Sequence, residues 1–361
     1  MVASKFFEAS MAELTVVMHP LLLIVSYDGF RHNYFEKQVT PTLQKLKTLG
    51  THAEYMRNVF ETKTFPNHHS IATGLFPEVH GVLANSLYDP IYKRVLNFSY
   101  ELWHQNENII PIWRLNENSG EGRYSGVMMW PGGGFTYQNT LPTHLQNYNT
   151  SISWEERVDM ALGWFLHPVT PANLVMLYFE EPDASSHIFG PESPQVLKQL
   201  AKLDRLTDYL HHRLVDNNLS DVVNVFHLSD HGMDTVTLDR IVNLTDYVDR
   251  STYITSGSSP NASLHDNFSV FKRADIPERW HFKNNNRTPP ILAVADEGYA
   301  FDDLFVYQDY YIHNYNITRE QSVTKPLVDP YNVVGDHVSA PVVTGVAARG
   351  PRARVGARYK F

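Results

Sequence analysis

The chain has 361 residues and no cysteine, 43% of its residues are hydrophobic, and its formal net charge at pH 7 is -9. This length and apolar content fit a folded domain with a sizeable core and exclude a disordered chain. The negative charge argues against binding of duplex nucleic acid, and the lack of cysteine excludes disulfides and thiolate metal sites.

Residues 1–19 are predicted to be an N-terminal extension. They lack the basic start and continuous apolar stretch of a signal peptide, and the run Leu21–Val25 is too short to span a bilayer. We therefore expect neither a leader nor a membrane anchor in this chain. Potential N-glycosylation triplets nevertheless favour the secretory pathway and an extracellular or cell-surface location. These triplets begin at Asn97, Asn149, Asn218, Asn243, Asn261, Asn267, Asn286 and Asn316.

Short apolar runs alternate with helical periodicity along the chain. This pattern predicts an α/β fold in which a central, mostly parallel sheet is flanked by helices. Leu21–Tyr27 is predicted to be the first buried strand. Thr40 and Pro41 then begin a helix as N-cap and first-turn proline, and Gly50 ends it. The apolar face of this helix is predicted to carry Leu43, Leu46 and Leu49.

The segment 88–148 differs from its surroundings because it is rich in asparagine, glycine and aromatic residues and has weak predicted elements. We interpret it as an insertion that lines the substrate pocket. The rest of residues 20–361 is predicted to form a single catalytic domain around it.

The second half of the chain continues the alternation of helices and strands. Ser153 and Glu156 form a predicted capping box before the second core strand, Leu174–Phe179. Ser193 and Pro194 begin a long helix with leucines at helical spacing. The remaining predicted strands are Val222–Leu228, Ile291–Ala295 and Val342–Ala347.

Acidic residues and histidines follow the three predicted core strands. Asp28 comes directly after the first strand, Asp183 four residues after the second, and Asp230 and His231 directly after the third. Ligands of open α/β sheets bind outside the carboxyl ends of the strands, so we expect these side chains to converge. Asp183 and His187 are four residues apart and share one face of a helical turn. A single aspartate after a strand is usually a turn former, but this combination favours a metal site.

Thr64 lies at a predicted helix start, two residues before Pro66. Its hydroxyl could cap the helix, as threonine often does. Alternatively it could be a nucleophile, because a helix N-terminus offers N–H groups and a positive dipole end to a phosphoryl group. A threonine hydroxyl needs activation for that role, so this hypothesis depends on the metal site.

Four sequence blocks resemble the signature blocks of the nucleotide pyrophosphatase/phosphodiesterase family, within the alkaline phosphatase superfamily. The blocks are YDGFR (Tyr27–Arg31), TKTFPNHHSIATGLFPEVHGVLANSLYDP (Thr62–Pro90), EEPDASSH (Glu180–His187) and LSDHGM (Leu228–Met233). The match runs in the expected order from about Leu21 to about Gly298. It implies an alkaline-phosphatase-like fold, with a central sheet between helices and two zinc ions.

The resemblance also implies roles for individual residues. One zinc would be held by Asp28, Thr64, Asp230 and His231. The other would be held by Asp183, His187 and a later histidine, for which His337 in VGDHVSAP is the candidate. Thr64 would be the nucleophile, and Asn85 would donate a hydrogen bond to a non-bridging phosphate oxygen. Phe65 and Tyr178 would line the nucleotide pocket.

The implied reaction is a two-metal displacement on a small nucleotide substrate. It would pass through a covalent nucleotidyl-threonine and release a nucleoside 5′-monophosphate. Two other hypotheses remain open: a phosphodiesterase for phospholipids or choline esters, and a glycosylated binding protein impaired in catalysis by the altered context of His337. A sulfatase is disfavoured because it would use a cysteine-derived nucleophile, and the sequence predicts no oligomeric state.

Overall fold

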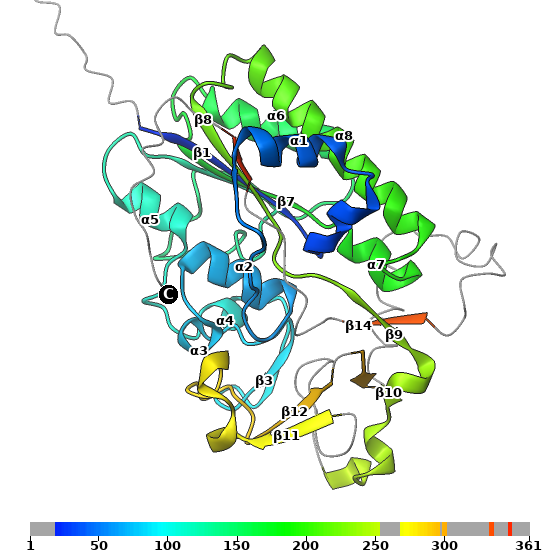
Figure 1. Ribbon diagram of the computed structural model, residues 1–361. Coiled ribbons are helices and arrows are strands. Elements are labelled where there is room, and N and C mark those ends of the chain that lie inside the picture. The colour runs from blue at the N-terminus through cyan, green and yellow to red at the C-terminus, as the bar shows by residue number, and fades with distance from the viewer. Residues whose placement is uncertain (1–18, 253–267, 297, 302–331, 336–345, 349–361) are drawn as a thin grey trace, which may run out of the picture.

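A seven-stranded sheet forms the centre of the molecule, with strand order β2-β15-β8-β1-β7-β5-β6. The computed structural model describes residues 19–252, 268–296, 298–301, 332–335 and 346–348. Strands β8, β1, β7, β5 and β6 are parallel to one another, whereas β15 is antiparallel to β8 and β2. The predicted fold class, a mostly parallel sheet flanked by helices, is therefore confirmed (Figure 1).

The three predicted core strands lie side by side. β1 (Leu21–Tyr27) pairs with β7 (Leu174–Phe179) on one side and with β8 (Val223–Leu228) on the other. Every residue of β7 is buried, as expected for a parallel strand covered on both faces. Because the three strands are parallel, their carboxyl ends meet at one edge of the sheet.

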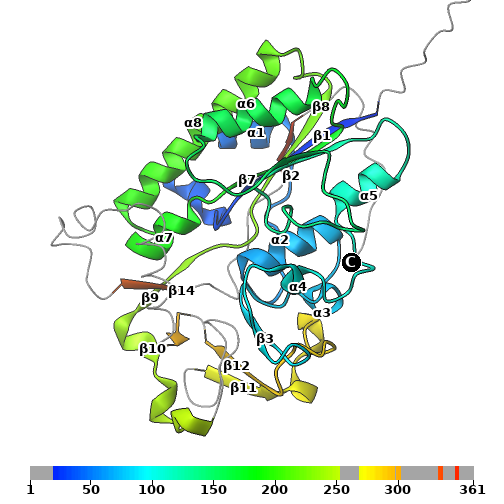
Figure 2. The ribbon, with the colours of Figure 1, turned by 180° about the vertical axis from the view of Figure 1, so that it is seen from behind.

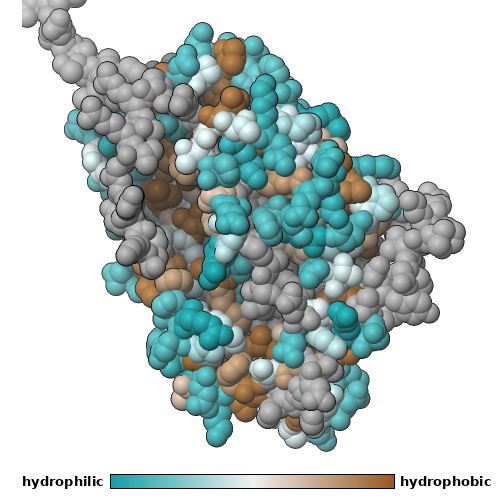
Figure 3. Space-filling model, viewed as in Figure 1, coloured by the Kyte–Doolittle hydropathy of each residue, from teal (hydrophilic) through white to brown (hydrophobic). Residues whose placement is uncertain are grey.

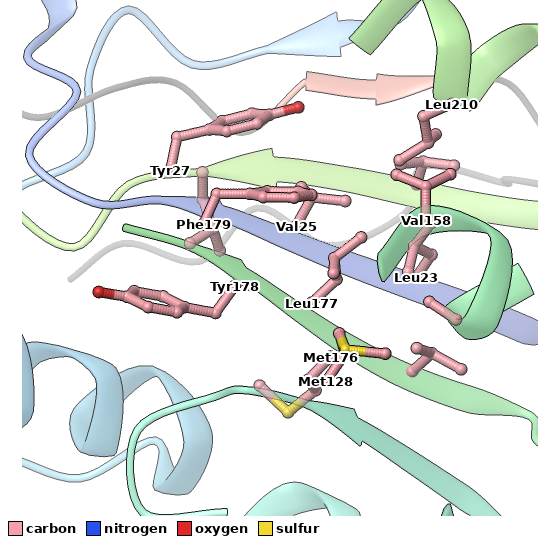
Figure 4. Close-up of a cluster of buried hydrophobic side chains, with 14 of the residues drawn as sticks. Leu23, Val25, Tyr27, Met128, Val158, Met176, Leu177, Tyr178, Phe179 and Leu210 are labelled. Carbon is pink, nitrogen blue, oxygen red and sulfur yellow. The ribbon is translucent and has the colours of Figure 1, made fainter. Parts of the chain in front are cut away.

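Side chains of β7 alternate between the two faces of the sheet. Leu177 lies with Val25 on the face that meets Val158 and Leu210 from the helices (Figure 4). Tyr178 points to the opposite face, toward the site described below. The Leu177 face of β7 therefore packs in the hydrophobic core, whereas the opposite face carries Tyr178 toward the candidate site.

Helices α1 (Pro41–Leu49), α6 (Trp154–Phe165) and α8 (Pro194–Asp216) lie together over one face of the sheet (Figures 1 and 2). The predicted capping box is present, because the Ser153 hydroxyl accepts from the Glu156 N–H and the Glu156 carboxylate accepts from the Ser153 N–H. In α1 the Thr40 side chain makes no cap hydrogen bond, and Leu49 is 58% exposed, contrary to expectation. The outer surface over α1 and α8 is largely hydrophilic (Figure 3), as expected for helices that bury one face.

The segment 88–148, predicted to be a pocket-lining insertion, forms regular elements. It completes a hairpin of β3 (Leu87–Asp89) and β4 (Arg94–Leu96) and then forms α4 and α5. It also supplies β5 and β6 to the central sheet, where β5 pairs with β7. The bounds of the later elements are α4 Tyr100–Trp103, α5 Ile112–Asn118, β5 Ser125–Met128 and β6 His144–Gln146.

The other face of the sheet and its carboxyl edge are covered by α2 (Thr64–Thr73), α5 and α7 (Asp183–Phe189) with shorter elements around them. The edge strand β2 spans Thr51–His52, and the remaining short elements of the described residues are η1 His32–Lys37, α3 Pro77–His80, η2 Leu238–Arg240, η3 Leu244–Asp246, η4 Arg250–Thr252, η5 Arg273–Asp275 and η6 Glu278–Trp280. Among the described residues no helix has the length and apolar character needed to cross a membrane.

Besides the β3–β4 hairpin, the described residues form three further two-stranded sheets apart from the central sheet. The predicted strand Ile291–Ala295 forms as β12, but it pairs with β11 in one of these small sheets. The predicted strand Val342–Ala347 corresponds to β15 (Val346–Ala348), and residues 342–345 lie outside the described residues. The remaining pairs are β10 with β13 and β9 with β14. Their bounds are β9 Asp234–Thr237, β10 Ile241–Val242, β11 Phe268–Lys272, β13 Ala300–Phe301 and β14 Asn332–Gly335.

Candidate metal centre

The carboxyl ends of β1, β7 and β8 bring Asp28, Asp183 and Asp230 together. All three side chains are buried. The backbone links two of them directly, because the Asp183 N–H donates to the Asp28 carbonyl at 3.0 Å. Ligand atoms of Asp28, Asp183 and His231 all lie within 4.8 Å of one another. The convergence expected from strand order is therefore present in the fold.

Gly29 permits this close approach. Its φ is +69°, and a Cβ at this position would lie 2.9 Å from the Asp183 Cβ. Such a φ favours glycine, and the missing side chain leaves room for the neighbouring carboxylate. The Gly29 N–H also donates to Asp230 Oδ1 at 3.2 Å. Gly29, the glycine of the YDGFR block, thus follows β1 and contacts the aspartates that follow the other two strands.

His231 presents a lone pair to this acidic group. Its Nδ1 lies 2.9 Å from the Gly232 carbonyl, which can only accept, so Nδ1 carries the proton. Nε2 is therefore unprotonated in the neutral ring and lies 3.2 Å from Asp230 Oδ2 and 3.4 Å from Asp28 Oδ1. Both oxygens are buried. Asp28 Oδ1 accepts no hydrogen bond from any residue that the structure describes, whereas Asp230 Oδ2 also has His68 Nδ1 beside it at 3.3 Å. A lone pair facing two buried carboxylate oxygens fits a bound cation.

The electrostatics of the carboxylates support the same assignment. Burial raises the pKa of Asp28 well above its ordinary range, and the charges of Asp230 and Asp183 raise it further. Burial also acts to raise the pKa of Asp230, but His231 and His68 beside it bring that pKa below its ordinary value. A divalent cation would offset the repulsion among these carboxylates, and imidazole with carboxylate oxygen is a donor set that zinc accepts.

Thr64 does not act as the cap of α2. It is the first residue of the helix, the N-cap position is Lys63, and no side chain makes a cap hydrogen bond. The Thr64 hydroxyl oxygen instead lies 3.4 Å from His231 Nε2. The hydroxyl is therefore directed to the candidate metal centre, which favours the nucleophile hypothesis over the capping hypothesis.

Asn85 and Phe65 lie at the same helix start. The Phe65 N–H donates to Asn85 Oδ1 at 2.8 Å, which leaves the Asn85 amide NH₂ available to donate to a ligand. Phe65 is half-buried and packs against Phe98 and Trp103, with ring centroids 5.7 and 5.2 Å away. Phe98 is 57% exposed, so an aromatic surface borders Thr64.

Tyr178 has a position that sequence reasoning did not anticipate. Its hydroxyl donates to Asp28 Oδ2 at 2.6 Å, and its side chain is 7% exposed. The predicted pocket residue therefore orients a candidate metal ligand. The strand alternation of β7 could have indicated this, because Tyr178 lies on the face opposite Leu177.

A second candidate group begins at α7. His187 Nε2 lies 3.2 Å from Asp183 Oδ1, so the predicted pair does share one helical turn. The Glu181 carboxylate accepts from the N–H and hydroxyl of Ser185 at 3.0 and 2.8 Å and steadies the start of this helix. His337, the predicted third ligand, lies outside the described residues.

His68 is a member of the site that sequence reasoning missed. Ligand atoms of His68, Asp28 and Asp230 also lie within 4.8 Å of one another. Its position four residues after Thr64 places both on one face of α2. That spacing was the available signal.

Comparison with known proteins identifies close relatives of this architecture. Residues 22–265 and 255–316 match the family model described as type I phosphodiesterase / nucleotide pyrophosphatase. Human ectonucleotide pyrophosphatase/phosphodiesterase family member 5 is 38% identical over 302 residues, covering 77% of this chain and 62% of the relative. Bis(5′-adenosyl)-triphosphatase enpp4 of Xenopus laevis is 38% identical over 299 residues, covering 78% of this chain and 65% of the relative.

A solved structure shares the fold over most of the chain. Murine ectonucleotide pyrophosphatase/phosphodiesterase 5, as an inactive threonine-to-alanine variant in complex with AMP, superposes with a TM-score of 0.79 at 33% identity. The superposition covers 92% of this chain and 88% of that one. By contrast, the chain spans somewhat less than two thirds of the full length of the two sequence relatives named above.

Proposed function

Because the chain belongs to the type I phosphodiesterase / nucleotide pyrophosphatase family, we propose that it hydrolyses nucleotide phosphodiester or phosphoanhydride bonds and releases a nucleoside 5′-monophosphate. One observation carries this proposal. The Thr64 hydroxyl lies at the first residue of α2, 3.4 Å from His231 Nε2, beside two buried carboxylates. This arrangement combines a nucleophile, an anion-binding helix start and metal ligands in one place.

Two zinc ions would bind at the carboxyl ends of the strands. Asp28, Thr64, Asp230 and His231 would hold one, and Asp183, His187 and His337 would hold the other. The zinc ions would lower the pKa of the Thr64 hydroxyl and of a water molecule, and would stabilise negative charge on the phosphoryl oxygens. Tyr178 would orient Asp28 through its hydrogen bond, and Gly29 would keep Asp28 and Asp183 at the required separation.

The Thr64 oxygen would attack phosphorus in line with the leaving oxygen. The Thr64 hydroxyl would release its proton to solvent, and the bond from Oγ1 to phosphorus would form while the bond from phosphorus to the leaving oxygen breaks, which gives a nucleotidyl-threonine. Water then cleaves the new bond, returns the proton to the threonine oxygen and releases the nucleoside 5′-monophosphate. The inactivity of a threonine-to-alanine variant of the murine relative, and its complex with AMP, support this route.

Substrate contacts would come from the residues that border Thr64. The Asn85 amide would donate to a non-bridging phosphoryl oxygen, since its carbonyl is already bonded to the Phe65 N–H. Phe65 and the exposed ring of Phe98 offer an aromatic surface for a nucleobase. The substrate would therefore be a small nucleotide, in keeping with the triphosphatase name of one relative.

An extracellular or cell-surface location accompanies this function. Two relatives carry the prefix "ecto" in their names. The side chains of Asn97, Asn149, Asn218 and Asn286, four of the predicted glycosylation positions, are exposed. These observations agree with the passage through the secretory pathway that the triplets predict.

Hydrolysis of model esters tests the function. We expect zinc-dependent release of p-nitrophenol from the p-nitrophenyl ester of thymidine 5′-monophosphate, much slower release from the monoester p-nitrophenyl phosphate, and loss of both with a chelator. Preferential cleavage of p-nitrophenyl phosphorylcholine would instead support the lipid or choline hypothesis. No turnover of any ester by folded, zinc-loaded protein would support the binding-protein hypothesis.

A further inference from the structure

The imidazole of His68 lies inside the protein, one turn of α2 after the candidate nucleophile Thr64. Its side chain is completely buried. The rings of Trp130 and Tyr178 meet it edge to face, with centroids 4.9 and 5.1 Å away and interplanar angles of 81° and 82°. Trp130 Nε1 also donates to the His68 carbonyl at 3.3 Å. These contacts hold the imidazole in a single orientation.

Each ring nitrogen of His68 has defined partners. Nδ1 lies 2.8 Å from the Thr64 carbonyl oxygen and 3.3 Å from Asp230 Oδ2. Nε2 lies 2.9 Å from the Ser26 hydroxyl. Because a carbonyl can only accept, Nδ1 carries a proton, which it directs to both Thr64 and Asp230. In the neutral ring Nε2 then accepts from the Ser26 hydroxyl.

This protonation pattern excludes His68 as a metal ligand, although it lies within 4.8 Å of Asp28 and Asp230 ligand atoms. A ligating nitrogen needs a free lone pair, whereas Nδ1 is a donor and Nε2 is directed to Ser26. The imidazole instead connects two groups that must work together. One is the backbone of the candidate nucleophile on α2, and the other is a candidate metal ligand at the end of β8.

We propose that His68 is a positioning residue that fixes the Thr64 backbone and the Asp230 carboxylate relative to each other through its Nδ1–H. This assignment rests on the proposed function, because it concerns the distance between nucleophile and metal ligand. A displacement of about 1 Å at such a site can cost on the order of 100-fold in rate. His68 does not contact the substrate, so its loss lowers kcat and leaves KM nearly unchanged.

Two amide substitutions distinguish the role of His68 Nδ1 from that of Nε2. In His68→Asn the amide lies near the position of Nδ1 and can still donate to Thr64 and Asp230. In His68→Gln the amide reaches toward Ser26 and the Nδ1 donor is lost. We expect kcat for the thymidine diester to fall about 10-fold in His68→Asn and about 100-fold in His68→Gln. Both variants lose the aromatic ring, so packing loss alone does not produce this order.

A matched control is the neighbouring residue His69. It is also completely buried, and its ring nitrogens make no hydrogen bond within the described part of the chain. His69→Asn and His69→Gln are expected to lower the urea midpoint without a difference in kcat between them. Urea unfolding of all four variants separates loss of stability from loss of positioning.

Zinc retention provides a readout that is independent of turnover. After dialysis against a graded series of chelator concentrations, His68→Gln is expected to lose zinc at about 10-fold lower chelator than His68→Asn, because Asp230 is no longer held. Equal zinc retention and equal kcat in the two His68 variants would overturn the positioning role. If the wild type cleaved no nucleotide ester but this order of zinc retention held, the proposed function would fail while the positioning role stood.

Discussion

Individual side chains at the strand ends set the distances within the candidate site. Tyr178 holds Asp28 by a 2.6 Å hydrogen bond, and the Gly232 carbonyl fixes the His231 ring so that Nε2 faces the carboxylates. Gly29 has the opposite role, because it contributes no side chain where Asp183 approaches. The geometry of the site thus depends on supporting residues as much as on the ligands.

Gly29→Ala tests this dependence. The added Cβ would lie 2.9 Å from the Asp183 Cβ, at a φ of +69° that alanine disfavours. We expect a loss of about 1–3 kcal/mol in unfolding free energy and markedly weaker zinc binding. Gly74→Ala is the matched control, since Gly74 has a φ of +70° but no atom within 4 Å of a built Cβ. If both variants bound zinc equally well, the close approach would have no role in the site.

At the scale of elements, the strength of each local pattern decided what the sequence could predict. β1, β7 and β8 were predicted because their apolar runs are long and continuous. β5 was missed because it is short and contains Gly126, where the Trp164 ring occupies the space of a side chain. Its place in the sheet is set by pairing with β7, a long-range contact that no local pattern reports.

Asp28, Asp183, Asp230 and His231 could be proposed as ligands for the same reason, because they follow the three strong strands. His68 could not be assigned in this way. Its role depends on partners in α2, β1 and the loop after β8, which come together only in the folded chain. The sequence shows its spacing from Thr64 but not the carboxylate that it meets.

The capping box of α6 gives a prediction at this scale. Ser153→Ala removes the acceptor for the Glu156 N–H, so the unfolding free energy should fall by about 1 kcal/mol. Urea unfolding measures this loss, and ester hydrolysis should be unchanged because α6 is remote from Thr64. Glu155→Ala, in the same helical turn but outside the capping box, should change stability by less than about 0.5 kcal/mol. Equal effects of the two substitutions would contradict the role of the cap.

Across the whole molecule, buried histidines link stability to pH. Burial and, to a smaller extent, the charge of nearby His104 lower the pKa of His69 from its ordinary value of 6.5 to about 3. Burial likewise lowers the pKa of His211 to about 4. Below pH 6.5 these histidines take up a proton in the unfolded chain but remain neutral in the folded protein. Their contribution to the free energy of unfolding is therefore complete above pH 6.5. It is lost as the pH falls from 6.5 toward the folded-state pKa values of about 3 and about 4.

Replacement of His69 tests this linkage. Between pH 7 and pH 5 the His69 contribution should fall by about 2 kcal/mol, because the unfolded state alone takes up the proton. In His69→Leu the difference in unfolding free energy between these two pH values should shrink by that amount, as measured by urea unfolding. An unchanged difference would show that His69 does not remain neutral in the folded protein.

The fold as a whole concentrates the chemistry at one place, where three parallel strand ends meet the start of α2. The measurement that tests this most directly is acid quench of zinc-loaded protein during turnover of the p-nitrophenyl ester of thymidine 5′-monophosphate, followed by peptide mass spectrometry. We predict a thymidylyl group on Thr64, and a loss of turnover of at least about 1,000-fold in Thr64→Ala. An unmodified Thr64 in the wild type, together with near-normal turnover by Thr64→Ala, would contradict the account.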